Sequence, residues 1–197
     1  SIADTARVLS RYVDAIMIRT TTHDRLLELA QYASVPVINA LTDDTHPCQL
    51  MADVMTFEEH SGPIKDKKIA WTGDGNNVLN SFMHASAKFD FDLAIATPHG
   101  RQPDQRFLDW GQKNGARIKT YKDAERAVSD SDCVVTDTWV SMGQEGKDIE
   151  KFWPYQVKAE LMACAKDTAI FTHCLPMHEW EEVSEEVAKS PASVIYD

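Results

Sequence analysis

Short apolar runs that alternate with helical stretches constrain the fold of this chain more than any other feature. The alternation is most regular after residue 67. There the expected strands are residues 68–71, 92–97, 116–121, 132–136, 168–172 and 194–196, and the expected helices are residues 77–89, 103–114, 123–129, 154–165 and 178–189. Strands and helices that alternate at this spacing predict βαβ units around a parallel sheet with both faces covered. We therefore expect an α/β protein with doubly wound parallel sheets.

The first sixty residues show the same alternation at a smaller scale. We expect strands at residues 15–18 and 35–39 and helices at residues 23–33 and 47–60. Pro36 suggests that the second strand begins there or lies at a sheet edge. Ser61-Gly62-Pro63 would end the last helix. The expected domains are therefore residues 1–61 and 62–197.

The charge balance argues against two classes of partner. The 197 residues include 20 Lys and Arg against 31 Asp and Glu, a formal charge of −11. Such a surface repels phosphate backbones and anionic lipids, so we expect neither a nucleic-acid nor a membrane partner. No apolar run is long enough to span a bilayer, no signal-peptide pattern is visible, and the four cysteines form no C-x-x-C pair. These features favour a cytoplasmic protein.

Two expected strands of the first domain end in candidate anion-binding residues. His46 falls at a helix N-cap, and Gln49 follows one turn later on nearly the same face. A helix N-terminus suits a phosphate or a polarised carbonyl, and the imidazole and amide could bind a planar carbamoyl group. Arg19 follows the first strand and could hold a phosphate bidentately. The alternatives are a capping His, a helix-surface Gln and a solvent-exposed Arg.

Two strand ends of the second domain also carry polar clusters. Gly73-Asp74-Gly75 lacks the third glycine of a dinucleotide-binding motif, so a turn that serves another ligand stays open beside a nucleotide site. Asp137 and Ser141 could hold a cationic amino acid, with the carboxylate taking the ammonium group. Alternatively, Asp137 caps its turn.

The segment after the expected strand 168–172 places a thiol beside an imidazole. Adjacent residues of an extended segment point to opposite faces, so His173 and Cys174 are not expected to form a catalytic dyad. A zinc site of His173, Cys174 and His178 would lack a fourth ligand and the usual spacing. A buried structural cysteine is the remaining alternative.

Three motifs together resemble the ornithine carbamoyltransferases. They are His46-Pro47-Cys48-Gln49, residues 137–143 (Asp-Thr-Trp-Val-Ser-Met-Gly) and His173-Cys174-Leu175-Pro176, and the flanking residues 4–11, 32–37 and 73–77 agree. The resemblance covers essentially the whole chain. It implies two parallel-sheet domains, the first truncated, one for carbamoyl phosphate and one for ornithine.

The resemblance also implies an activity and its residues. The family transfers the carbamoyl group of carbamoyl phosphate to the δ-amine of L-ornithine, giving L-citrulline and phosphate in arginine biosynthesis or catabolism. It uses no cofactor or metal, and its members are typically homotrimers. The implied carbamoyl phosphate contacts are Arg19, His46, Pro47, Cys48, Gln49, Cys174 and Leu175, and the implied ornithine contacts are Asn77, Asp137, Ser141 and Met142.

Within this site the implied catalytic residues are Arg19, His46, Asp137 and Cys174. The first two would stabilise the tetrahedral oxyanion, and the last two would orient the amine. No covalent intermediate is expected, so Cys174 would be an orienting group. Asp137→Asn should cut turnover and spare carbamoyl phosphate binding.

The chain also departs from the family. Family members are longer and carry an upstream Ser-x-Arg-Thr loop and a downstream Arg-bearing segment, neither of which occurs here. We therefore expect an internal fragment that is inactive, or nearly so, on its own. The alternatives are a transcarbamoylase for acetylornithine or putrescine, a catalytically silent carbamoyltransferase-like subunit and a nucleotide-binding module.

Overall fold

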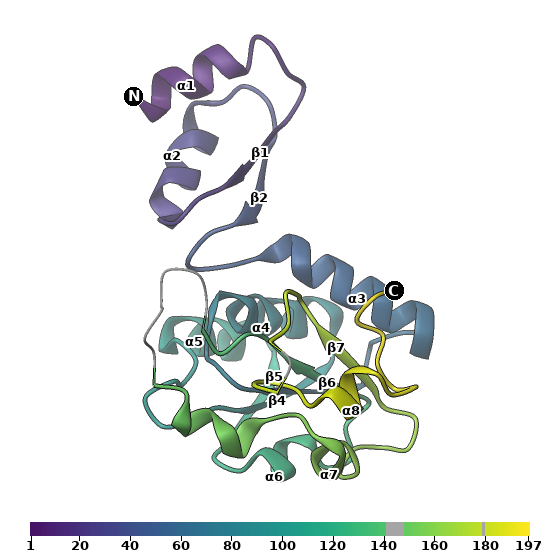
Figure 1. Ribbon diagram of the computed structural model, residues 1–197. Coiled ribbons are helices and arrows are strands. Elements are labelled where there is room, and N and C mark those ends of the chain that lie inside the picture. The colour runs from purple at the N-terminus through teal and green to yellow at the C-terminus, as the bar shows by residue number, and fades with distance from the viewer. Residues whose placement is uncertain (141–147, 179) are drawn as a thin grey trace.

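The computed structural model describes residues 1–140, 148–178 and 180–197, and it has two lobes. A narrow first lobe, which contains a two-stranded parallel sheet, stands on a broader second lobe, which contains a five-stranded parallel sheet (Figure 1). Parallel strands joined through helices confirm the expected α/β class. No helix in the described part of the chain is long and apolar enough to cross a membrane.

The first lobe has helices on one face of its sheet only. Its elements are α1 (Ile2–Leu9), β1 (Ile16–Arg19), α2 (His23–Tyr32) and β2 (Val37–Leu41). Ala6, Ile16 and Leu29 form its small buried cluster. The alternate strand residues face away from the helices, so Met17 and Ile38 remain exposed.

Helix α3 (Pro47–Ser61) connects the lobes and packs mainly on the second one (Figure 1). Proline is favoured in the first helical turn, and Pro47 occupies it here. Leu50, Val54 and Phe57 of α3 belong to the main core cluster of the second lobe. Gly62 ends the helix with φ at 74°, a left-handed conformation that glycine adopts without strain.

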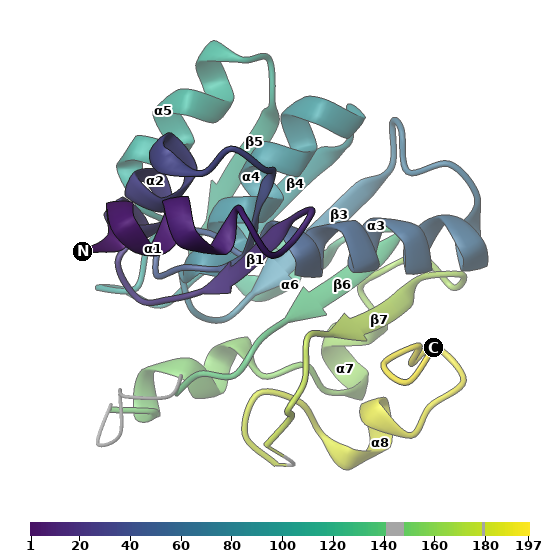
Figure 2. The ribbon, with the colours of Figure 1, turned by 90° about the horizontal axis from the view of Figure 1, so that it is seen from above.

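The second sheet has the strand order β5-β4-β3-β6-β7, and all its pairs are parallel. Its strands are β3 (Lys68–Thr72), β4 (Asp92–Ala96), β5 (Arg117–Tyr121), β6 (Cys133–Thr136) and β7 (Ile170–His173). Its α-helices are α4 (Asn77–Phe89), α5 (Gln105–Lys113), α6 (Ala124–Val128), α7 (Ala159–Met162) and α8 (Glu185–Ala188). Figure 2 shows helices on both sides of the sheet, as in a doubly wound fold.

The expected helix over residues 154–165 is wrong, because the chain forms two short helices here. A 3-10 helix covers Glu150–Tyr155, and α7 begins only at Ala159. Val157, which is fully buried, lies between them and forms an isolated parallel bridge with Val183. The burial of this extended residue prevents a continuous helix.

The expected helix over residues 178–189 is also wrong, because only Glu185–Ala188 is helical. Val183 is held extended by its bridge to Val157, and Ser184 then caps α8 by accepting a hydrogen bond from the Val187 N–H. The expected strand over residues 194–196 is wrong too. The chain makes only an isolated bridge there, between Phe171 and Ser193.

Candidate active-site cleft

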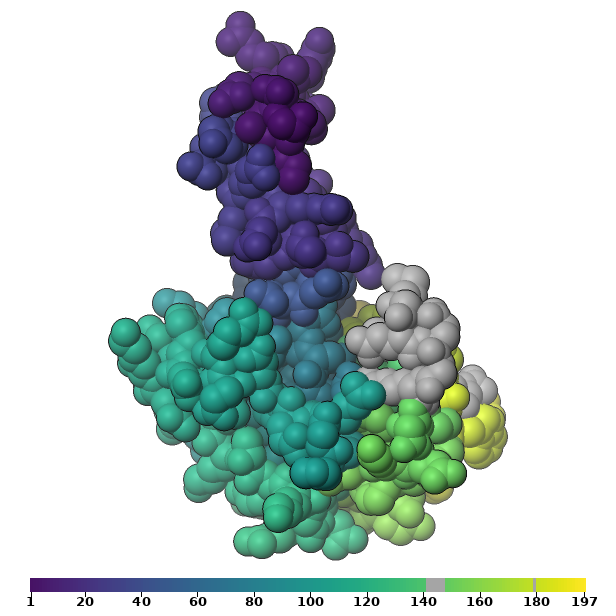
Figure 3. Space-filling view, turned by 90° about the vertical axis from the view of Figure 1, so that its left-hand side faces the viewer, coloured from purple at the N-terminus to yellow at the C-terminus, as the bar shows by residue number. Residues whose placement is uncertain are grey.

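A cleft of about 1180 Å³ lies where the carboxyl ends of both parallel sheets meet. The segments that follow β1, β2, β3, β4, β6 and β7 all contribute residues to its lining. Figure 3 shows the narrow first lobe above the broader second lobe. Ligands of open parallel sheets bind beyond the carboxyl ends of the strands, so the cleft is the candidate site.

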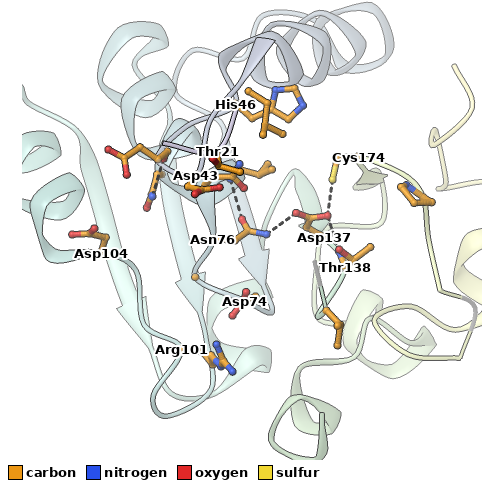
Figure 4. Close-up of a pocket in the computed structure, with 18 of the residues that line it drawn as sticks. Thr21, Asp43, His46, Asp74, Asn76, Arg101, Asp104, Asp137, Thr138 and Cys174 are labelled. Carbon is orange, nitrogen blue, oxygen red and sulfur yellow. Dashed lines mark hydrogen bonds between the residues drawn. The ribbon is translucent and has the colours of Figure 1, made fainter. Parts of the chain in front are cut away.

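Asp137, which follows β6, is the centre of the polar network in the cleft. Its Oδ2 accepts a hydrogen bond from Asn76 Nδ2 at 2.6 Å, and its Oδ1 accepts from the Thr138 N–H at 2.7 Å. The Cys174 thiol also donates to Oδ1, at 2.7 Å (Figure 4). The Asp137 side chain is therefore fixed from three segments that lie far apart in the sequence.

Asn76 is a site residue that the sequence analysis missed. It is the N-cap of α4, and its Oδ1 accepts from the N–H groups of Val78 and Leu79, so its amide nitrogen is free to face Asp137. The predicted residue Asn77 also lines the cleft, but its Nδ2 donates to the Thr42 carbonyl at 2.7 Å. An Asn directly before a predicted helix was the available signal, because Asn is a favoured N-cap.

The structure confirms that Cys174 and His173 form no dyad. The two side chains point to different partners: Cys174 faces Asp137, while His173 Nε2 lies 3.0 Å from Glu182 Oε1 inside the protein. His173 Nδ1 accepts from the Leu175 N–H at 2.9 Å, which assigns the ring proton to Nε2. Burial, together with the charge of Asp137, raises the pKa of the Cys174 thiol far above its ordinary value. A thiol in this state is a hydrogen-bond donor and a poor nucleophile.

His46 and Arg19 lie at the first-lobe side of the cleft, as predicted. His46 is the N-cap of α3, and its N–H donates to Ser81 Oγ at 2.8 Å, which ties this turn to α4. Burial, reinforced by the charge of Arg19, lowers the pKa of His46, so the ring is neutral at pH 7. Its buried Nδ1 has no hydrogen-bond partner among the described residues.

The other three residues of the His46-Pro47-Cys48-Gln49 motif do not belong to the lining of the cleft. Pro47 lines a smaller pocket, and the Cys48 thiol donates to the Asn39 carbonyl at 3.3 Å. Gln49 Nε2 donates to Asp53 Oδ1 at 2.9 Å, one turn further along α3. Burial, with a smaller contribution from the charge of Asp137, raises the pKa of Asp53 to about 7. The binding roles of Pro47, Cys48 and Gln49 stay predictions.

Of the other predicted contacts, Leu175 lines the cleft, whereas Ser141 and Met142 lie outside the described residues. The sequence analysis did not single out the loop after β4, although Arg101 and Asp104 from this loop line the cleft (Figure 4). The signal for this loop was a cluster of polar residues at a strand end, and it was overlooked.

Gly75 allows the loop after β4 to lie against the loop after β3. A Cβ at this position would be 2.5 Å from the carbonyl oxygens of Arg101 and Gln102. The Gly75 N–H donates to the Arg101 carbonyl at 3.0 Å. Gly75 therefore serves the close packing of these two loops, whereas a Cβ at Gly73 would lie 3.1 Å from Thr136 Oγ1.

The fold and the cleft define an α/β protein that can hold small charged molecules between two lobes. Residues 1–59 match the family described as "Aspartate/ornithine carbamoyltransferase, carbamoyl-P binding domain", and residues 65–197 match "Aspartate/ornithine carbamoyltransferase, Asp/Orn binding domain". The chain belongs to the aspartate/ornithine carbamoyltransferase family. The resemblance predicted from the three motifs is thus confirmed.

Individual relatives agree with this assignment. The ornithine carbamoyltransferase of Brucella abortus (strain 2308) is 63% identical over 199 residues, and that of Mesorhizobium japonicum is 62% identical; both alignments include all of this chain. The solved ornithine carbamoyltransferase from Pyrococcus furiosus superposes with a TM-score of 0.93 at 47% identity, over all of this chain and 65% of that one. The chain spans 64% of the length of the Brucella protein and 66% of the Mesorhizobium protein.

Proposed function

We propose that the protein containing this chain transfers the carbamoyl group of carbamoyl phosphate to the δ-amine of L-ornithine, giving L-citrulline and phosphate. The observation that carries the proposal is the Asp137 network, which faces His46 and Arg19 across one cleft. This arrangement offers an acceptor for a cationic amino acid on one side and donors for an anion on the other. The names of the relatives supply ornithine as the acceptor, and the description of the matched family supplies carbamoyl phosphate as the donor.

On the acceptor side, Asp137 is placed to bind an amino group. A carboxylate offers about four acceptor positions, and the three donors described above occupy three of them. One position is thus left for an N–H of the substrate. The neutral Cys174 thiol beside it orients the amine without competing as a nucleophile. Asn77, Ser141 and Met142 complete the acceptor site in this proposal.

On the donor side, Arg19 is exposed at the end of β1 and has no ion pair with any described residue, so its guanidinium is free to bind a phosphate. The neutral His46 can donate one hydrogen bond to the carbamoyl oxygen. Pro47, Cys48, Gln49 and Leu175 are proposed as further contacts of carbamoyl phosphate.

The chemistry balances without a covalent intermediate on the protein. The neutral δ-amine attacks the carbamoyl carbon, and a C–N bond forms as the carbonyl π-electrons move to oxygen. The carbonyl then re-forms as the C–O bond to phosphate breaks, and the proton that the amine loses passes to the departing phosphate. Arg19 and His46 would stabilise the oxyanion, which is typically worth a few kcal/mol per donor. Holding both reactants in one cleft supplies much of the remaining acceleration.

Three further assignments belong to this proposal. Residues 1–61 are proposed to belong to the carbamoyl phosphate domain and residues 62–197 to the ornithine domain, which the two matched family descriptions support. A homotrimer is proposed from the family resemblance. A cytoplasmic location suits the four cysteines, which are all unpaired.

Label transfer tests the proposed reaction. The full-length protein would be incubated with ornithine and carbamoyl phosphate labelled at the carbonyl carbon, and the products would be separated and identified by mass spectrometry. We expect the label in citrulline, with phosphate released in equal amount. Phosphate release without labelled citrulline would show hydrolysis in place of transfer and would contradict the proposal.

A further inference from the structure

The loop between β7 and α8 contains the one group of three potential metal ligands found among the described residues. His178, Glu181 and Glu182 each offer a ligand atom, and these atoms lie within 4.8 Å of one another. No element of the proposed carbamoyl transfer uses the three side chains together. Figure 2 shows this loop at the edge of the sheet, beyond the carboxyl end of β7.

Glu182 is the unusual member of the group because its carboxylate is fully buried and only one of the two oxygens has hydrogen-bond partners among the described residues. Its Oε1 accepts from His173 Nε2 at 3.0 Å and from the His178 N–H at 2.7 Å. Its Oε2 is buried and has no hydrogen-bond partner among the described residues. Burying a carboxylate oxygen without a partner costs free energy, and a bound cation or a hydrogen-bond donor would offset this cost.

His178 lies on the open side of that oxygen. Its Nδ1 is 3.9 Å from Glu182 Oε2, and its side chain is 49% exposed. His178 and Glu181 also line the cleft, so an ion can approach from there. No lysine or arginine forms an ion pair with either glutamate in the described part of the chain, so neither carboxylate is occupied by such a cation.

We propose that His178, Glu181 and Glu182 form a binding site for a divalent transition metal ion of the Zn²⁺ class. Two ligands that bind one Zn²⁺ at about 2.1 Å can be at most about 4.2 Å apart. The 3.9 Å between His178 Nδ1 and Glu182 Oε2 meets this limit, whereas the 4.8 Å spread of the group exceeds it. Glu181, which is only partly buried, closes the difference by rotating its side chain.

The ligand set selects this class of metal. An imidazole nitrogen with two carboxylates suits Zn²⁺ and its neighbours, whereas Ca²⁺ and Mg²⁺ prefer oxygen ligands alone. Three protein ligands leave one coordination position to water. The hydrogen bond from His173 to the other oxygen of Glu182 supplies the outer contact that orients a metal-binding carboxylate. The site is independent of the proposed carbamoyl transfer, which needs no metal.

Metal titration of the chelator-treated chain tests the proposal. Zn²⁺ would be titrated by calorimetry, and Co²⁺ would serve as a spectroscopic probe of the ligands. We expect one ion per chain, with Kd raised at least about tenfold by His178→Ala and by Glu181→Gln. Both changes affect side chains that are not fully buried, and far-ultraviolet circular dichroism confirms the fold of each variant.

Matched controls separate this site from adventitious binding. His99→Ala and Glu186→Gln alter an exposed imidazole and an exposed carboxylate elsewhere, and they should leave Kd unchanged. The proposal is overturned if the chain binds no Zn²⁺, or if the two ligand variants bind it as tightly as the parent. It is also overturned by a sulfur-to-cobalt charge-transfer band that Cys174→Ser abolishes, because the ion would then lie on the thiol.

Discussion

The thiol of Cys174 donates to the carboxylate of Asp137 across 2.7 Å, although the two residues follow different strands. This contact joins β6 and β7 at the cleft and keeps sulfur in its protonated form. In the proposed reaction, the pair would present the carboxylate of Asp137 to the substrate, and the protonated thiol would not act as a nucleophile.

Asp137→Asn should lower kcat of the full-length protein about 100-fold or more, since the charge that holds the acceptor amine is lost. An amide at this position also cannot accept from all three present donors. The KM for carbamoyl phosphate should change less than about threefold, because its proposed contacts, Arg19 and His46, lie on the other side of the cleft. Steady-state kinetics with each substrate varied in turn checks this. An equal loss for both substrates would remove Asp137 from the acceptor site.

Cys174 should be alkylated slowly. Its pKa is raised by burial and by Asp137, so the reactive thiolate is scarce at neutral pH. Treatment with iodoacetamide at pH 7 and pH 9, followed by peptide mass spectrometry, compares it with the partly exposed Cys164 within the same sample. Cys164 should react first at both pH values. Faster modification of Cys174 at pH 7 would mean that the thiol is ionised and that the orienting role is wrong.

Asp53 should make the protein less stable as the pH rises. Its folded-state pKa is about 7 against an ordinary value of 3.8, so between these pH values the folded chain keeps a proton that the unfolded chain has lost. Unfolding free energy therefore falls across this window and levels off above it. The amide that Asp53→Asn introduces can still accept from Gln49. The substitution should reduce the difference in unfolding free energy between pH 5 and pH 8 by about 1–3 kcal/mol, as measured by urea unfolding at both pH values.

The matched control for Asp53 is Asp109 on α5, which accepts the same kind of hydrogen bond from Gln105 but is exposed. Asp109→Asn should leave the pH dependence of stability as it is in the parent. If Asp53→Asn and Asp109→Asn had the same effect, burial of Asp53 would not be the cause.

Gly75→Ala should damage both stability and the cleft. The added Cβ would meet two backbone carbonyl oxygens at 2.5 Å, so the loop after β4 must move, at a cost of about 1–3 kcal/mol. Turnover should fall as well, because the next residue, Asn76, holds Asp137. Gly115→Ala is the control: its φ of 82° strains an alanine, but a Cβ there meets no atom within 4 Å. It should lower stability and spare turnover. Full turnover in Gly75→Ala would show that the loop contact does not shape the site.

The sequence predicted the parallel sheets well because most strands are compact apolar runs between clear breaks; β5, Arg-Ile-Lys-Thr-Tyr, is the exception. Asn77–Phe89 was predicted to the residue, since Asn76 caps it and an apolar face runs its length. The errors cluster after residue 150, where Val157 and Val183 bridge each other across the chain. A bridge between distant residues leaves no local pattern in the sequence. Helical periodicity therefore predicted continuous helices where a tertiary contact holds the chain extended.

The candidate site divides in the same way. Asp137, His46 and Cys174 could be predicted because each directly follows a strand or begins a helix, and such positions meet at the carboxyl edge of a parallel sheet. Asn76 was overlooked beside Asn77, although its place directly before the predicted helix was the signal for an N-cap. The buried Glu182, with one oxygen that has no hydrogen-bond partner among the described residues, could not be predicted either, because its burial depends on the tertiary structure of the loop.

The central claim is tested most directly by measuring which acceptor the full-length protein carbamoylates. Ornithine, acetylornithine, putrescine and aspartate would be offered separately, each with carbamoyl phosphate. The account predicts efficient transfer to ornithine and a kcat/KM at least about 100-fold lower for the other three, because Asp137 is proposed to hold an amino group and ornithine alone among the four carries a free α-amino-acid group together with a second amine. Preferred transfer to aspartate, or no transfer to any of the four, would contradict it.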